Sequence, residues 1–345
     1  MRTIDVMPLV VGVPGCELST IDRDVLERVQ PAGIVLFSRN IESAEQTRFL
    51  VEQLRELGTP PFVAADLEGG IVNRFSGLWG DLPTPAAAGK AGRRAVLALG
   101  EAAGAACRRL GIQLDLAPVV DLDCPGGCLS EQGRCLSDDP ERLVVLAGLF
   151  NDGLATWGVT GCSKHFPGLG WVPADTHVDL PVLDLAEAEL ARQISVFEML
   201  GPVFPAVMMA HVVVPGLGDG ERPASLSRTV VEMAASLPGS PVVLSDDIEM
   251  GALDEWGDLP ERVALALAAR NHGVLVCKAF DRLDDIVEHL SELAATDSTI
   301  SSRVTEMAAR MGTLRNEICQ KAAAVPAPDD ETVAQLWEQA RRKAG

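Results

Sequence analysis

The chain has 345 residues, of which 47% are hydrophobic and 23% are charged, so it can bury a large core and lacks the composition of a disordered protein. Its formal net charge of −20 argues against nucleic acid and against a membrane surface as partners, because both are anionic and attract basic proteins. No apolar run reaches the roughly 18 residues of a membrane span. The N-terminal stretch is interrupted by Asp5 and Pro14 and lacks the form of a signal peptide, so we expect a cytoplasmic protein.

Eight short apolar runs recur along the chain, and segments with helical patterns separate them. Most of the runs are apolar on both faces, as strands buried in a parallel sheet are. In chain order they are PLVVGV (8–13), GIVLF (33–37), FVAAD (62–66), QLDLAPVVD (113–121), GVTGC (158–162), PAVMMAH (205–211), PVVLSDD (241–247) and GVLVC (273–277). This alternation predicts an α/β fold, a single (β/α)₈ TIM-type barrel. An open doubly wound sheet is the alternative, although no Gly-x-Gly-x-x-Gly follows the first run.

Capping residues mark the ends of several predicted helices. Ser43 and Gln46 predict a capping box at the start of one helix, and Gly58 predicts a left-handed turn at its end. Asp139-Pro140 predicts the start of another helix, and Gly158 its end.

The last part of the chain has a helical pattern. One helix face carries Leu283, Ile286, Leu290 and Leu293. The segment AVPAPDD (324–330) predicts a linker before a last helix over about 331–343. We therefore expect one domain over residues 1–345, with the barrel at about 8–280 and C-terminal helices at about 281–345.

Polar side chains follow five of the eight runs. They are Asp66, Glu68 and Arg74 after the third run, Asp121 and Arg134 after the fourth, Lys164, His165, Asp175 and His177 after the fifth, His211 after the sixth, and Asp246 and Asp247 after the seventh. Taken singly, these residues have structural explanations, such as helix capping for Asp66, a surface ion pair for Arg134 or a core position for His211. Because the chemistry of a barrel takes place at the carboxyl ends of its strands, their coincidence favours one shared site.

The residue types expected at this site indicate a class of reaction. A carboxylate nucleophile beside a proton donor is what glycosyl transfer requires. Charged hydrogen-bonding groups also suit a polyhydroxylated substrate. We therefore predict a small carbohydrate substrate and no metal or organic cofactor.

Three of the 8 cysteines, Cys124, Cys128 and Cys135, lie close together in one predicted loop. A metal-binding or redox role is the alternative to a purely structural one. The segment has no histidine and no Cys-x-x-Cys pair, which argues against a zinc site.

The segment KHFPGLGWVPADTHVDLP (164–181) resembles the signature of bacterial β-N-acetylglucosaminidases of glycoside hydrolase family 3. That signature runs Lys-His-Phe/Ile-Pro-Gly, then His or Leu, Gly, four variable residues and Asp-Ser/Thr-His, and residues 164–177 match it in full. Further similar stretches are DLEGGIVNRF (66–75), AHVVVPGLGDGERPASLSR (210–228) and VVLSDDIEMGAL (242–253). The similarity covers about residues 8–280, the whole predicted barrel.

The resemblance implies a retaining mechanism with named residues. It implies that Asp246 is the nucleophile, that His177 is the acid/base, and that Asp175 holds the imidazole of His177. It implies contacts with the sugar for Asp66, Arg74, Arg134, Lys164 and His165, and a position in the pocket lining for His211. The implied reaction releases terminal β-linked N-acetylglucosamine from peptidoglycan fragments during cytoplasmic cell-wall recycling.

The sequence also departs from the family pattern. Ile71 replaces an arginine that is common after Glu-Gly-Gly, and Leu67 replaces a glutamine. These changes bear on subsite preference more than on the reaction. The alternatives are a β-N-acetylglucosaminide phosphorylase with the same site, a β-glucosidase, and a barrel that binds muropeptides without turnover.

Overall fold

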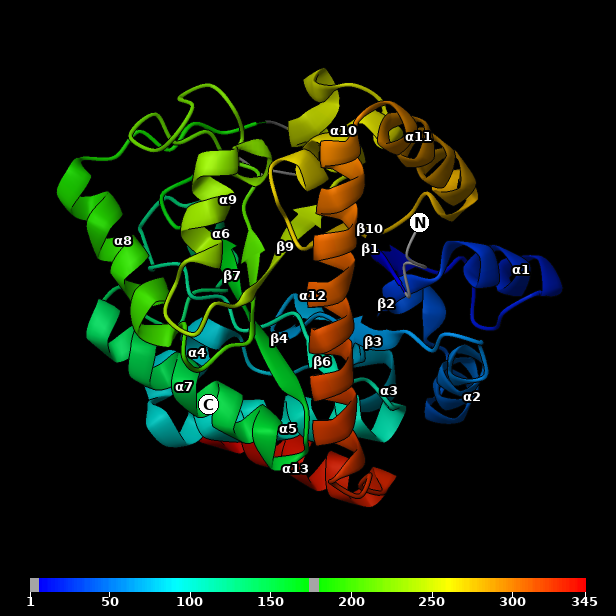
Figure 1. Ribbon diagram of the computed structural model, residues 1–345. Coiled ribbons are helices and arrows are strands. Elements are labelled where there is room, and N and C mark those ends of the chain that lie inside the picture. The colour runs from blue at the N-terminus through cyan, green and yellow to red at the C-terminus, as the bar shows by residue number, and fades with distance from the viewer. Residues whose placement is uncertain (1–5, 174–179) are drawn as a thin grey trace.

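The computed structural model describes residues 6–173 and 180–345, in which eight parallel strands close into a barrel (Figure 1). The strands are, in order around the barrel, β1 (Met7–Gly12), β2 (Pro31–Leu36), β3 (Phe62–Ala65), β6 (Leu114–Asp115), β7 (Thr160–Phe166), β8 (Ala206–Met209), β9 (Val242–Asp247) and β10 (Gly273–Val276). β10 pairs with β1, with Leu275 opposite Val10, so the sheet is closed and the open-sheet alternative is wrong. Each of the eight predicted runs overlaps one strand, which confirms the predicted fold class.

Helices cover the outside of the barrel, and a short antiparallel hairpin of β4 (Leu67–Gly69) and β5 (Val72–Asn73) follows β3. The helices are α1 (Thr20–Val29), α2 (Ala44–Arg55), α3 (Ser76–Trp79), α4 (Pro85–Ala91), α5 (Arg93–Leu110), α6 (Cys128–Glu131), α7 (Pro140–Thr156), α8 (Glu187–Leu200), α9 (Arg228–Ala235), α10 (Leu259–Ala268), α11 (Leu283–Thr296), α12 (Ser298–Ala323) and α13 (Asp330–Ala344). In the part of the chain that the structure describes, no helix combines the length and apolar composition that crossing a membrane requires.

The predicted ends of α7 are confirmed, whereas those of α2 are only partly so. Asp139 caps α7, and Gly158 follows its end in the left-handed region with φ of 71°. Ser43 caps α2 by accepting the N–H of Gln46, but the Gln46 side chain accepts from the residue before Ser43, so the predicted capping box is wrong. Gly58 does not have a positive φ, because the helix has already ended at Arg55, and the prediction of a left-handed turn there is wrong.

The barrel interior is apolar toward the amino-terminal ends of the strands and charged toward their carboxyl ends. Interior apolar residues from three strands include Ala64, Cys162 and Leu244. Because strand side chains repeat every two residues, Asp66, Lys164 and Asp246 point the same way, one layer nearer the carboxyl ends. The alternation that builds the core therefore also delivers charged groups to the mouth.

The long helix α12 closes the opposite, amino-terminal end. Met311, Leu314 and Ile318 belong to the same buried cluster as the barrel interior, and Met311 lies against Gly273 at the start of β10. In Figure 1, α12 crosses in front of the strands. The prediction of a single domain over residues 1–345 stays a prediction, which this packing supports.

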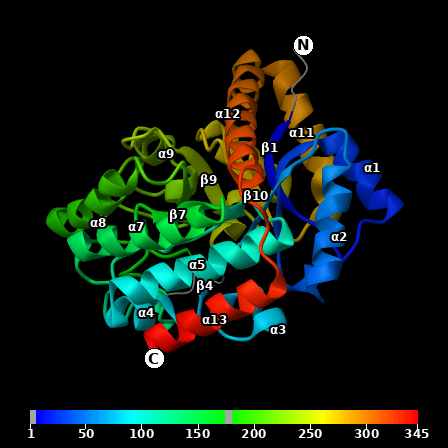
Figure 2. The same ribbon diagram turned by 90° about the horizontal axis from the view of Figure 1, so that it is seen from below.

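The remaining C-terminal helices pack on the outside. Three residues of the predicted face of α11 are buried, namely Leu283, Ile286 and Leu290, whereas Leu293 is only partly buried. Figure 2 shows α13 lying along α5. The ring of Trp337 on α13 lies 5.6 Å from that of Trp79, measured between centroids.

Removing the Met311 side chain tests the closure by α12. We expect Met311→Ala to lower the free energy of unfolding by about 2–5 kcal/mol, because it leaves a cavity at the floor of the barrel. The control is Asn316, which is exposed on the same helix. Asn316→Ala should change the free energy of unfolding by less than about 0.5 kcal/mol. Urea unfolding at neutral pH measures both, and equal losses would contradict the role given to α12.

Candidate active site

A cavity of about 270 Å³ opens at the carboxyl ends of the strands. Six of the nine residues predicted for the site line it, namely Asp66, Arg74, Arg134, Lys164, His165 and Asp246. Asp175 and His177, the predicted acid/base pair, lie outside the described residues.

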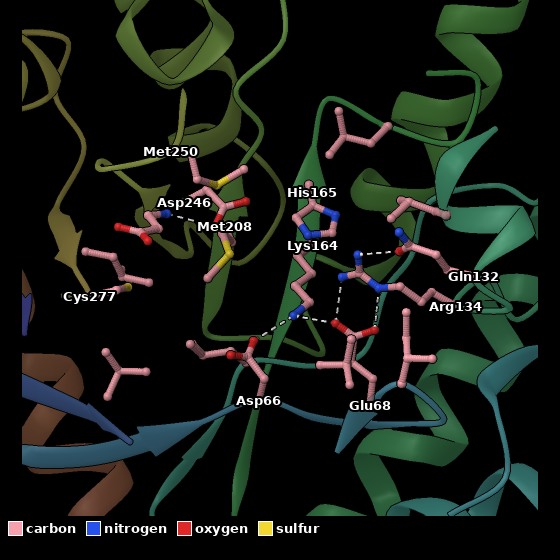
Figure 3. A pocket seen from close by; sticks show the side chains of 18 of the residues that line it. Asp66, Glu68, Gln132, Arg134, Lys164, His165, Met208, Asp246, Met250 and Cys277 are labelled. Atoms are coloured by element: carbon pink, nitrogen blue, oxygen red, sulfur yellow. Dashed lines mark hydrogen bonds and ion pairs between the residues drawn. The ribbon is translucent and has the colours of Figure 1, made fainter. Parts of the chain in front are cut away.

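An ion network forms one side of the pocket (Figure 3). The Nζ of Lys164 lies 2.9 Å from Oδ1 of Asp66 and 2.6 Å from Oε1 of Glu68. The guanidinium of Arg134 donates two hydrogen bonds of 2.8 Å to Glu68, and that of Arg74 donates one of 3.1 Å to Asp66. The side chains of Lys164 and Glu68 are only 3% and 1% exposed, so most of this charge is out of contact with bulk water.

The network keeps its members ionised at neutral pH. Burial by itself raises the pKa of a carboxyl group, but Lys164 and Arg134 more than offset it and lower the pKa of Glu68 to about 2. Lys164 and Arg74 likewise hold the pKa of Asp66 well below its usual range. Burial by itself lowers the pKa of Lys164. The carboxylates of Asp66 and Glu68 raise this pKa by more than burial lowers it, so it lies above the ordinary value.

Two adjacent aspartates from β9 form the opposite side of the pocket. Oδ1 of Asp246 accepts the N–H of Asp247 at 2.8 Å, and no described residue forms an ion pair with Asp246. Burial, together with the charges of Glu249 and Asp246, raises the pKa of Asp247 to about 6. Near pH 6, Asp247 therefore takes up a proton, which reduces the negative charge beside Asp246.

A buried carboxylate orients His165 and the start of the loop that follows β7. Asp121 accepts hydrogen bonds from the N–H of His165 at 3.2 Å and of Leu169 at 2.6 Å, and it lies 2.8 Å from the ring Nδ1 of His165. Gln193 on α8 accepts the N–H of Leu122 at 2.8 Å and so fixes the segment that carries Asp121. Asp121, itself positioned through Gln193, therefore fixes His165 and Leu169 at the start of the loop.

Comparison with known proteins identifies the family. Residues 5–310 match the family described as the Glycosyl hydrolase family 3 N terminal domain. The chain belongs to glycosyl hydrolase family 3. It is therefore a glycoside hydrolase and acts on carbohydrate.

Three bacterial proteins illustrate what this family 3 chain is similar to. The chain is 34% identical over 297 residues to a "Beta-hexosaminidase" of Bordetella avium (strain 197N), covering 82% of this chain and 84% of that one. The structure of a family 3 β-N-acetylglucosaminidase from Paenibacillus sp. str. FPU-7 matches with a TM-score of 0.88 and 26% identity, over 100% of this chain and 69% of that one. NagZ from Neisseria gonorrhoeae, in complex with N-trifluoroacetyl-D-glucosamine, matches with a TM-score of 0.74 and 27% identity, over 97% and 90%. These matches confirm the resemblance to bacterial family 3 β-N-acetylglucosaminidases.

His211 lies behind the pocket in this family 3 barrel. It is fully buried; its Nδ1 lies 2.7 Å from Oγ of Ser225, and its Nε2 lies 2.9 Å from the backbone carbonyl of Asp247. Because a carbonyl oxygen only accepts, Nε2 carries the proton. His211 is absent from the pocket lining formed by the described residues, and its predicted place there stays a prediction.

Two acidic residues of the site had no predicted role. Glu68 forms an ion pair with Arg134 in which the two side chains are only 1% and 14% exposed, so the surface ion pair considered for that arginine is wrong. Asp115 is fully buried and accepts the N–H of Leu67 at 2.9 Å through Oδ1, while Oδ2 has no hydrogen-bond partner in the described structure. Asp115 could have been noticed in the sequence because it is a charged residue within the apolar run 113–121.

The cysteine-bearing loop forms part of the pocket wall. Cys128 lines the pocket, and its N–H donates to the carbonyl of Val172 at 2.8 Å. Cys124, Cys128 and Cys135 form no disulfide with one another. Within residues 6–173 and 180–345, no three His, Cys, Asp or Glu side chains are grouped as metal ligands. Through Cys128 and Val172, this loop is hydrogen-bonded to the signature segment that begins at Lys164.

Replacing Lys164 tests the ion network. We expect Lys164→Met to lower the free energy of unfolding by about 3–5 kcal/mol at pH 7, because Asp66 and Glu68 each lose a buried partner. The depressed carboxyl pKa values stabilise the wild type above about pH 4.5, and this stabilisation is lost as the pH falls toward 2. The difference between variant and wild type should therefore stay near its pH 7 value down to about pH 4.5 and shrink as the pH falls from there to 3.

The control for this change is Lys90→Met, at an exposed position on α4. Denaturant unfolding at pH 7 and at pH 3 measures the effect. A loss for Lys164→Met that is the same at pH 3 and pH 7 would contradict the electrostatic explanation.

The raised pKa of Asp115 predicts a specific dependence of stability on pH. Burial, with the charges of Asp66 and Glu68, raises the pKa of Asp115 well above 3.8. Above pH 3.8 the unfolded chain releases this proton and the folded chain keeps it, so rising pH favours unfolding. Residue 115 cannot titrate in Asp115→Asn. The free energy of unfolding of this variant, relative to wild type, should therefore rise by up to about 1.4 kcal/mol per pH unit from pH 5 upward. Parallel stability curves for the variant and wild type would contradict a protonated Asp115, and exposed Asp281→Asn is the control.

Proposed function

We propose that the chain is a retaining exo-β-N-acetylglucosaminidase that removes terminal β-linked N-acetylglucosamine. The observation that carries this proposal is a pocket that combines Asp246, a carboxylate with no ion pair to any described residue, with a set of fixed charged donors and acceptors. The names of the bacterial relatives support this sugar specificity.

The ion network is suited to bind the sugar hydroxyls. Asp66, Arg74, Arg134 and Lys164 hold one another in place before substrate arrives, so little reorganisation is required on binding. Carboxylate oxygens accept hydrogen bonds from hydroxyl groups, whereas the lysine and the arginines donate. We assign His165, held by Asp121, to the same wall.

The proposed reaction proceeds in two displacements. A carboxylate oxygen of Asp246 attacks C1 of the sugar while the C1–O bond to the aglycone breaks, and His177 gives its proton to the departing oxygen. In the second step His177 takes a proton from water, the water oxygen attacks C1, and the bond to Asp246 breaks. Asp175 would stabilise the protonated imidazole.

The proposed natural substrates are peptidoglycan fragments in which N-acetylglucosamine is linked to 1,6-anhydro-N-acetylmuramic acid carrying a peptide. Their cleavage would belong to cell-wall recycling in the cytoplasm. The resemblance of the signature segment to bacterial family 3 β-N-acetylglucosaminidases supports this assignment.

Substitution of the proposed catalytic residues tests the mechanism. We expect Asp246→Ala to lower kcat for 4-nitrophenyl β-N-acetylglucosaminide by roughly a thousandfold or more, because no glycosyl-enzyme forms. His177→Ala should lower it by about 10²–10⁴-fold. Azide should restore turnover of Asp246→Ala and give the α-glycosyl azide, since a single displacement inverts C1.

Exposed Asp281→Ala is the matched control and should retain full activity. Activity of Asp246→Ala close to that of wild type would overturn the assignment of the nucleophile. Release of the sugar 1-phosphate in phosphate buffer would instead establish the phosphorylase. Binding without turnover by folded wild type would favour the non-catalytic barrel.

A further inference from the structure

Ile71 is an exposed apolar side chain at the mouth of the pocket. It lies at the tip of the β4–β5 hairpin and contributes to the pocket lining, yet it is 64% exposed. The fold therefore gains little by burying it, and the side chain is available to a bound molecule.

The hairpin holds Ile71 in a fixed place. Gly69 and Gly70 precede it with φ of 100° and 58°, a region that glycine adopts readily, and a Cβ at Gly69 would collide with the carbonyl oxygen of Pro83. The N–H of Gly70 donates to the carbonyl of Leu82 at 3.2 Å. Since Gly69 and Gly70 hold the start of the turn against Leu82 and Pro83, the backbone that carries Ile71 is positioned before a ligand binds.

Other apolar side chains continue this surface around the mouth. Val72 stands beside Ile71 on the hairpin, Leu129 comes from α6, and Val172 comes from the loop after β7. All four lie outside the barrel strands, whereas Asp66, Lys164 and Asp246 lie in the strands or directly after them. Leu129 and Val172 are 5% and 2% exposed, so Ile71 is the exposed member of this apolar part of the pocket wall.

The charges of the pocket disfavour an anion at this outer position. Its three described lysine and arginine side chains, Arg74, Arg134 and Lys164, all donate to Asp66 or Glu68. Asp246 and Asp247 add negative charge on the other side. A carboxylate near the scissile bond would therefore meet no uncompensated cation among the described lining residues.

We propose that Ile71, with Val72, Leu129 and Val172, forms the aglycone subsite, and that it selects uncharged aglycones with an apolar face beside the glycosidic oxygen. This inference rests on the proposed function, in which the sugar occupies the charged layer and the leaving group points outward. A 1,6-anhydro sugar has this character, because its internal bridge removes the hydroxyl groups at C1 and C6.

The test compares two substrates that differ in charge, phenyl and 4-carboxyphenyl β-N-acetylglucosaminide, on wild type, Ile71→Ser and Ile71→Arg. We expect Ile71→Ser to lower kcat/KM for the phenyl substrate about tenfold, because an apolar contact is lost. Ile71→Arg should raise the ratio of carboxyphenyl to phenyl kcat/KM about tenfold or more over the wild-type ratio. Comparing ratios between variants cancels the different leaving-group acidities.

Ile21→Ser is the matched control, since Ile21 is 74% exposed on α1 and lies outside the pocket lining. The inhibition constant for free N-acetylglucosamine should stay unchanged in all variants, because that sugar fills only the charged layer. Unchanged selectivity in both Ile71 variants, or an equally weakened inhibition by N-acetylglucosamine, would overturn the aglycone subsite. If wild type cleaves neither substrate, the proposed function fails and the subsite fails with it.

Discussion

The buried contact of Lys164 with Asp66 and Glu68 organises the functional end of this barrel. Burying a charge costs several kcal/mol unless a partner compensates it, so these three side chains are stable there only together. They come from β7, from the end of β3 and from the hairpin after it, and Arg134 adds the loop after β6. The ion network therefore fixes the relative positions of segments that the barrel strands alone leave free.

The carboxylates around the pocket differ in whether a cation lies beside them, and this difference separates their roles. Asp66 and Glu68 are held ionised by cations and are suited to hydrogen bonding, whereas Asp246 has no cation beside it in the described structure. Asp115 is buried with a raised pKa and supports the hairpin by accepting the N–H of Leu67. Environment, more than residue type, thus decides which acid binds, which supports and which is available to react.

The two ends of the barrel serve different needs. At the amino end α12 covers the strands with Met311, Leu314 and Ile318, which contributes apolar burial and no chemistry. At the carboxyl end the loops are connected by polar contacts such as those of Asp121 and Gln193. Because the side chain of Ile71 is 64% exposed, this position contributes little apolar burial and a change there costs the fold little.

Local patterns in the sequence sufficed to predict the barrel and the residues that reach its mouth. Apolar runs alternating with helices predict the strands, and Asp66, Lys164 and Asp246 follow or end their runs directly, so a period of two places them. The left-handed turn expected at Gly58 does not form, because α2 ends earlier, at Arg55, and the N–H of Gly58 donates to Glu27 on another helix. What the sequence by itself determined was therefore which strands form and which side chains they direct toward the pocket. The tertiary structure alone decided the partners: Glu68 and Arg134 are 66 residues apart, and Asp66 and Lys164 are 98 apart. A buried charge pairs with whichever opposite charge the closed barrel brings within reach, and no local pattern encodes that distance.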